Sequence, residues 1–153
     1  MTTPAPSQRD PITCHVLDTT TGRPAPNIAV KLSWSENPNI TFSSVTNRDG
    51  RIANWQFDKS SFPMEDLYNQ VRAATGEGDI TIEFMITNWG AQGKAALPKG
   101  SSMWKLEFDT GAYFGIEKTF FPKVELTFLV KPGEHFHVPL LLGPYSYTTY
   151  RGS

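Results

Sequence analysis

The three histidines are the residues of this chain with the most direct chemical use. His15 lies near the start, within the apolar stretch 12–17, and His135 and His137 lie near the end, in the segment HFHVP. An unperturbed imidazole has a pKa of about 6.5, so it takes up and releases a proton near neutral pH. The placement of these histidines in short, strand-like segments therefore points to proton transfer.

Two other interpretations of the histidines stay open. A single histidine in a strand is more often a structural residue than a catalytic one. In addition, the H-x-H spacing of His135 and His137 can bind zinc from one face of a strand, with His15 as a third ligand. Cys14 is expected to face the core, and no acidic ligand is obviously supplied alongside the histidines, so we expect no metal.

Composition limits the class of protein. A length of 153 residues indicates one domain with a sizeable core, and a net charge of -1 gives no electrostatic basis for binding nucleic acid or an anionic membrane. Cys14 is the only cysteine, which excludes an internal disulfide, and no apolar run is long enough to span a bilayer.

The two ends of the chain give expectations for domain bounds and location. Residues 1–11 are polar and Pro-rich, so we expect a flexible N-terminal extension before a domain at 12–153. The final Arg-Gly-Ser differs from the Ser-Lys-Leu peroxisomal signal. The cytoplasm is the default location, and the peroxisome is left open.

Hydrophobic alternation predicts an all-β chain of short strands. The segments with this pattern are 12–17, 28–32, 42–46, 52–57, 80–86, 103–108, 124–130, 135–142 and 145–151. A helix is predicted over 61–75, a Gly-rich loop over 90–102, and a short helix or turn over 109–114. Short strands separated by turns, with little helix, predict an antiparallel β-sandwich.

Strand parity places the histidines on an outer face of this sandwich. The inward positions are expected to be Ile12, Cys14 and Val16 in the first strand, and Phe136, Val138 and Leu140 near the end. His15 and His137 then point outward, beside Leu17 and Leu141. Such a face is rarely left to water, so we expect a second subunit to cover it and the imidazoles to meet in a cleft shared between subunits. Pro139 cannot donate to a ladder and is expected to mark an edge or a bulge.

Several segments together resemble one enzyme family. They are ITCHVLD at 12–18, GRPA at 22–25, TNRDGR at 46–51, FFPKV at 120–124, HFHVPLLL at 135–142 and YRGS at 150–153. In this order they are similar to the 5-hydroxyisourate hydrolases, the transthyretin-like enzymes of purine catabolism. The tetrapeptide at 150–153 is similar to the terminal tetrapeptide that separates these hydrolases from transthyretin proper. Residues 61–102 depart from the family pattern and resemble an insertion.

The resemblance implies a transthyretin-like β-sandwich that assembles as a homotetramer, a dimer of dimers, with active sites between the dimers and with neither metal nor cofactor. The implied reaction is hydrolysis of a cyclic C–N bond of 5-hydroxyisourate, giving 2-oxo-4-hydroxy-4-carboxy-5-ureidoimidazoline. The family's functional residues fall on His15, Arg51, His137 and the segment 150–153. One histidine would act as the base, while the other orients water or protonates the leaving nitrogen, and the sequence does not assign the two roles.

The resemblance also implies roles for the remaining site residues. Arg51 would offer paired donors to substrate oxygens, although its position after an Asp-Gly turn also fits a solvated arginine. Tyr150 and Arg151 are expected to bind substrate, and Ser153 to hydrogen-bond substrate or water without acting as a covalent nucleophile. The alternative function is a non-catalytic carrier of small aromatic ligands, as transthyretin is.

Overall fold

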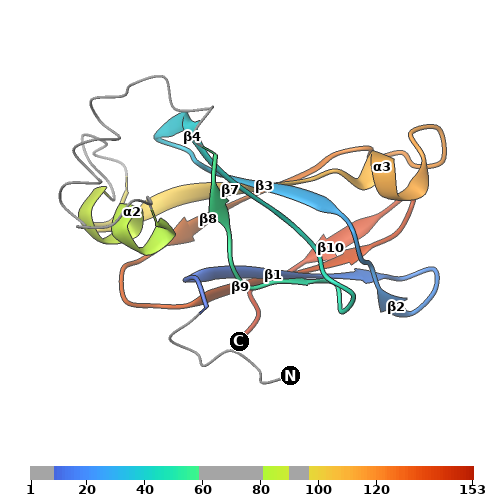
Figure 1. Ribbon diagram of the computed structural model, residues 1–153, viewed down its shortest axis with the longest axis horizontal. Helices are drawn as coiled ribbons and strands as arrows, with labels where there is room; N and C mark the ends of the chain where they lie inside the picture. Colours follow the sequence, from blue (N-terminus) through green and yellow to red (C-terminus); the bar gives the residue numbers. More distant parts are fainter. Residues whose placement is uncertain (1–8, 59–80, 90–96) are drawn as a thin grey trace.

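The computed structural model describes residues 9–58, 81–89 and 97–153, which form two five-stranded sheets packed face to face (Figure 1). The first sheet contains β1 (Ile12–Asp18), β2 (Arg23–Pro24), β5 (Arg51–Ile52), β9 (Phe136–Leu142) and β10 (Tyr147–Thr149). The second contains β3 (Ala29–Trp34), β4 (Asn37–Val45), β6 (Gln56–Phe57), β7 (Ser102–Phe108) and β8 (Val124–Val130). Two helices, α2 (Ile82–Trp89) and α3 (Thr110–Phe114), lie at opposite ends of the sandwich (Figure 1). The all-β sandwich prediction is confirmed.

The core lies between the two sheets, where the alternation of the strands places it. In β1 and β9 the inward residues Ile12, Cys14, Val16, Phe136, Val138 and Leu140 are all buried. They pack with the largest buried side chains of the second sheet, which include Trp104, Phe42 and Phe108. Burial raises the pKa of the Cys14 thiol to about 12, so this cysteine is a core residue, as its strand position predicts.

The expectation that all strands pair antiparallel is wrong at the centre of the first sheet. β1 runs parallel to β9, with Thr13 opposite His137 and His15 opposite Pro139. Parallel neighbours need a long crossover, and here most of the chain supplies it, because β3, β4, β7 and β8 form the other sheet between them. Strands from the two ends of the chain therefore lie side by side.

The strand expected over 52–57 is two short strands in different sheets. β5 pairs with β1, placing Ile52 opposite Cys14, whereas β6 pairs with β4, placing Phe57 opposite Phe42. The chain crosses from one sheet to the other between them, and one continuous strand cannot belong to two packed layers.

The strand expected over 80–86 is also wrong, because residues 82–89 form α2. Ile82, Met85 and Ile86 are buried on one face of this helix, at the i, i+3, i+4 spacing. The hydroxyl oxygen of Thr81 accepts a hydrogen bond from the Phe84 backbone N–H and so caps the first turn. The alternating isoleucines of this segment fit a period of 2 as well as a period of 3.6, and contacts with the core decide for the helix.

Other predicted segments are confirmed or lie outside the described residues. The short helix expected over 109–114 is α3, which Asp109 caps by accepting from the backbone N–H of Ala112. The predicted helix over 61–75 and most of the Gly-rich loop lie outside the described residues, as do residues 1–8. No helix in the described ranges is long and apolar enough to cross a membrane.

Asp10 and Pro11 are hydrogen-bonded to the sandwich. The backbone N–H of Asp10 donates to the carbonyl of Ala53, and its carboxylate accepts from the backbone N–H of Trp55 at 2.7 Å. The carbonyl of Pro11 accepts from the backbone N–H of Phe136. The last residues of the expected extension are thus tied to the sandwich, next to the start of β9.

The turn before β5 requires a glycine at position 50. Gly50 has a φ of 72°, in the left-handed region, and a Cβ there would clash with the Val16 carbonyl oxygen and lie 3.1 Å from the Ala25 backbone nitrogen. Gly22 has nearly the same φ, 71°, but a Cβ there would meet nothing within 4 Å. A side chain at either position would strain the backbone, but only a side chain at position 50 would also clash with neighbouring atoms.

Gly50→Ala should destabilise the fold more than Gly22→Ala. The left-handed backbone should cost about 1–2 kcal/mol at either position. The clash at position 50 should add about 1–3 kcal/mol. Urea unfolding of both variants at one protein concentration measures the difference, and equal losses of unfolding free energy would show that the close approach to β1 has no energetic weight.

Candidate active site

The outer face of the first sheet brings together side chains from distant parts of the chain. Arg51 of β5 lies directly opposite His15 of β1, and Thr13 of β1 lies opposite His137 of β9. Gly152 forms an isolated bridge with His137, which extends the same sheet to the C-terminal tail, residues 150–153. Residues of opposite ends of the sequence therefore share one surface.

The rings of His15 and His137 are stacked, with 6.5 Å between their centroids and an interplanar angle of 27°. Both side chains are partly exposed. We expected the imidazoles to meet across a subunit boundary, and they meet within a single chain instead. The reason is the parallel pairing of β1 with β9, which the sequence pattern does not reveal.

Both stacked histidines hold depressed pKa values. Burial lowers the pKa of His15 and of His137, and the Arg51 guanidinium lowers both further. A hydrogen bond to the Asp49 backbone and the Asp49 carboxylate act in the opposite direction on His15, but the net shift is downward. At pH 7 each ring therefore favours its neutral form, which has a lone pair with which to accept a proton.

His137 is held from three sides. Its Nδ1 lies 2.8 Å from the Thr13 hydroxyl, and the His15 ring lies beside it with 6.5 Å between the ring centroids. The backbone N–H of Gly152 donates to the carbonyl of His137 at 2.8 Å, and a Cβ on Gly152 would lie 2.8 Å from Cδ2 of the ring. The edge that carries Cδ2, the atom next to Nε2, therefore packs against the C-terminal tail, and only a glycine fits there.

His135 joins the cluster through the same threonine. Its Nε2 lies 3.2 Å from the Thr13 hydroxyl oxygen, and burial followed by the nearby Arg9 cation lowers the pKa of its ring. It also borders a hollow of about 650 Å³ between α2 and the turn that precedes β9. The sequence pattern singled out neither Thr13 nor this contact; the available signal was that Thr13 shares a face with His15.

The described ranges 9–58, 81–89 and 97–153 contain no group of three or more His, Cys, Asp or Glu side chains placed to hold a metal ion. His135 and His137 instead share the Thr13 hydroxyl as a hydrogen-bond partner. The geometry thus offers no ligand set for the zinc alternative within these ranges.

The C-terminal tail is anchored by its backbone and by Arg151. The guanidinium of Arg151 lies 3.3 Å from the Glu134 carboxylate and 4.8 Å from the centre of the Phe136 ring. Tyr150 is exposed and lines, with His137, a hollow of about 430 Å³. Ser153 is exposed. Contacts of these three tail residues with substrate stay predictions.

Pro139 lies inside the sheet and not at its edge, since β9 is flanked by β1 and β10. The ladder between β9 and β10 stops at the pair of Leu140 and Thr149, and it resumes in the same register where His137 meets Gly152. Proline has no N–H to continue the ladder. The Pro139 carbonyl instead accepts from the Thr149 hydroxyl at 2.8 Å, so a side-chain hydrogen bond holds the two strands together at this interruption.

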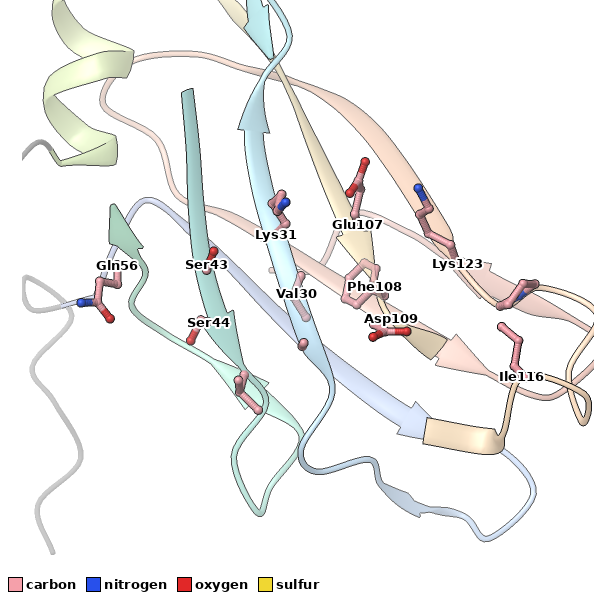
Figure 2. Close-up of a pocket in the computed structure, with 13 residues that line it drawn as sticks. Val30, Lys31, Ser43, Ser44, Gln56, Glu107, Phe108, Asp109, Ile116 and Lys123 are labelled. Atoms are coloured by element: carbon pink, nitrogen blue, oxygen red, sulfur yellow. The ribbon is translucent and has the colours of Figure 1, made fainter. Parts of the chain in front are cut away.

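A larger hollow, of about 730 Å³, lies on the outer face of the second sheet (Figure 2). Lys31 projects from β3 and Glu107 from β7, Lys123 lies just before β8, and Ile116 lies at the rim (Figure 2). No histidine lines it. The chemistry of the protein is therefore assigned to the first sheet, where the three histidines and Arg51 gather, and not to this larger space.

Comparisons with known proteins identify the family of the chain. A model of the HIUase/Transthyretin family matches residues 12–152. The chain is 33% identical to the probable 5-hydroxyisourate hydrolase of Schizosaccharomyces pombe, over 98% of this chain and 97% of that protein. It is also 33% identical to the 5-hydroxyisourate hydrolase of Mus musculus, over 96% of this chain and 98% of that protein.

Solved structures give the same result. The 5-hydroxyisourate hydrolase of Klebsiella pneumoniae superposes with a TM-score of 0.56 at 28% identity, over 93% of this chain and 98% of that one. Transthyretin from Sparus aurata superposes with a TM-score of 0.59 at 24% identity, over 94% and 97%, which shows a shared fold. With its sandwich, its matched length and its relatives in agreement, the chain belongs to the HIUase/Transthyretin family.

Proposed function

We propose that this protein hydrolyses 5-hydroxyisourate to 2-oxo-4-hydroxy-4-carboxy-5-ureidoimidazoline in urate degradation. The observation that carries the proposal is the stacked pair of His15 and His137 beside Arg51 on one sheet face. The relatives that bear the name 5-hydroxyisourate hydrolase support the choice of substrate. Water adds to a ring carbonyl, the adjacent C–N bond breaks, and the products are a carboxylate and an N–H group.

The two imidazoles supply the proton transfers of this reaction. Water has a pKa of about 15.7, so it attacks only if a base takes its proton as the new C–O bond forms. A neutral imidazole does this, and the depressed pKa values of His15 and His137 keep both rings in that form at pH 7. One ring accepts the proton from water, while the other orients the water or protonates the leaving nitrogen.

Arg51 serves the oxygens of the substrate. Its guanidinium presents several N–H donors in one plane, which suits two neighbouring carbonyl oxygens and the negative charge that develops on one of them during attack. Arg51 lies opposite His15 across the ladder, so a ring held by this fork would lie over the stacked imidazoles. The same cation adds to the effect of burial in lowering the pKa of both histidines.

A second copy of the chain would complete the cleft. Leu17 and Leu141 lie opposite each other on the histidine face and are partly exposed, as are both imidazoles. In the proposed homotetramer, a dimer of dimers, this face meets its copy at the interface between the dimers. Tyr150, Arg151 and Ser153 of the tail border the substrate in that assembly.

The histidines should be essential for turnover. With 5-hydroxyisourate generated from urate by urate oxidase, the protein should speed the decay of the intermediate. His15→Asn and His137→Asn should each reduce kcat by about 10²–10⁴-fold, the usual contribution of a positioned acid or base. Lys31→Asn, on the other sheet, is the control.

Two outcomes would contradict the proposal. Near-normal turnover in both histidine variants would exclude them as acid and base. Binding of 5-hydroxyisourate without faster decay by the wild type would favour the alternative function, a carrier of small aromatic ligands.

Arg51 should contribute both the paired N–H donors of its guanidinium and its positive charge. Arg51→Lys keeps the cation but loses the paired donors, and loss of a charged hydrogen bond worth about 1.5–3 kcal/mol should reduce kcat/KM by about 10- to 150-fold. Arg51→Gln also removes the cation, so the pKa of His15 and of His137 should rise. Because the neutral ring is the active base, the acid limb of the pH–rate profile should move to higher pH in Arg51→Gln alone.

Rates at several pH values, with NMR titration of the imidazoles, measure both effects. Full activity of Arg51→Lys would leave Arg51 as a solvated turn residue, and unchanged histidine titration in Arg51→Gln would remove its electrostatic role.

The C-terminal tail should be needed for activity and not for folding. Deleting residues 150–153, or appending a tag after Ser153, should abolish or sharply reduce turnover, because the tail packs on the edge of His137 that carries Cδ2. The same tag at the N-terminus is the control. Circular dichroism and thermal unfolding check the fold, and full activity of the C-terminally tagged protein would exclude the tail from the site.

A further inference from the structure

Thr13 lies between two imidazoles without belonging to the expected set of site residues. Its side chain is buried, with 4% of the residue exposed, and its hydroxyl oxygen lies 2.8 Å from Nδ1 of His137 and 3.2 Å from Nε2 of His135. The three residues meet because β1 pairs in parallel with β9 and places Thr13 opposite His137. The hydroxyl is therefore the link between the active-site ring and the third histidine.

This arrangement restricts where the protons are. A threonine hydroxyl has one proton to donate, and a neutral imidazole carries a proton on one of its two nitrogens. Among the described residues the Thr13 hydroxyl has no hydrogen-bond partner other than these two ring nitrogens, so it donates to one of them and accepts from the other. Either Nδ1 of His137 or Nε2 of His135 therefore carries a proton, but not both.

Which of these two nitrogens carries the proton decides what His137 offers to the substrate. Its Nδ1 is occupied by Thr13, so Nε2 is the nitrogen left for water or the leaving group. When Nδ1 carries the proton, Nε2 has a lone pair and acts as a base. When Thr13 donates to Nδ1, the proton is on Nε2 and the ring acts as a hydrogen-bond donor.

We propose that Thr13 is a positioning residue that couples His135 to His137, so that the proton on His135 selects whether Nε2 of His137 presents a lone pair or a proton. The inference rests on the proposed hydrolysis and deepens it, since it adds two residues that need not touch the substrate. The hydrogen bond from Thr13 to His137 fixes the orientation of the His137 ring. The two hydrogen bonds of Thr13, to His137 and to His135, together fix the tautomer of His137.

The same contacts provide a proton exit. When Nε2 of His137 takes a proton from water, the ring has one proton too many. The Nδ1 proton then passes to the Thr13 oxygen as the hydroxyl proton passes to Nε2 of His135. The charge leaves His137, the hydroxyl is restored, and His135 holds the proton.

His135 can release this proton because it borders the hollow of about 650 Å³ beside α2. The charged groups that line the hollow around it are Arg9, Asp10, Glu83 and Glu134. The carboxylates come from three different segments: the start of the chain, α2, and the turn that precedes β9. The hollow beside His135 thus offers carboxylates as proton acceptors.

The test compares variants that remove one link at a time. Thr13→Val keeps the shape and removes the hydroxyl, Thr13→Ser keeps the hydroxyl, and His135→Leu removes the second ring at a partly exposed position. Thr41→Val, which removes the hydroxyl of a buried threonine in the other sheet, is the matched control for a general effect on stability.

The first readout needs no substrate. Nitrogen-15 NMR of the unliganded full chain should show one dominant tautomer of His137 in the wild type, in Thr13→Ser and in Thr41→Val. Thr13→Val and His135→Leu should shift it to a mixture of both forms. An unchanged His137 tautomer in Thr13→Val and His135→Leu would overturn the coupling, whatever reaction the protein catalyses.

The second readout is turnover of 5-hydroxyisourate. Thr13→Val should lower kcat by about tenfold, the effect of one lost hydrogen bond, with KM little changed and the pH–rate profile displaced. Thr13→Ser should restore both. A tautomer shift without any change in kcat would keep the hydrogen-bond link but overturn its role in the reaction. If Thr13→Val fails to fold, His135→Leu carries the same two readouts.

Discussion

The pairing of β1 with β9 is the interaction on which the rest of the molecule depends. It joins residues 124 positions apart, Thr13 and His137, in a continuous parallel ladder from Ile12 opposite Phe136 to Asp18 opposite Leu142. A slip of one residue would turn every side chain of one strand to the opposite face. The buried residues of both strands prevent such a slip, so the core that stabilises the sandwich also keeps the imidazoles in contact.

The three histidines of the cluster built on this pairing can each take a positive charge, but their lowered pKa values favour neutral rings at pH 7. Three histidines lie near Arg51 and Arg9, and burial together with these cations lowers the pKa of every ring. A site of this kind suits a base that must stay unprotonated at neutral pH. Transthyretin from Sparus aurata has the same fold, so function depends on the side chains of this face and not on the sandwich.

Much of the fold follows from hydrophobic alternation, and the exceptions share a cause. The strands at 103–108, 124–130 and 135–142 lie where alternation places them. The segment 80–86 satisfies two periods at once, and residues 52–57 divide between two sheets. In both, contacts with distant parts of the chain decide the outcome, and local periodicity carries no information about such contacts.

The sequence by itself determined the residue types, the inward and outward faces of β1 and β9, and the order of motifs that resembles one enzyme family. Strand parity is a local property, so it placed His15 and His137 outward correctly. Only the tertiary structure decided that these rings stack in one chain, that Thr13 bridges His137 and His135, and that Gly152 packs on the ring edge. Those contacts depend on which strands become neighbours and in which direction they run, and that choice is made by burial of the whole core.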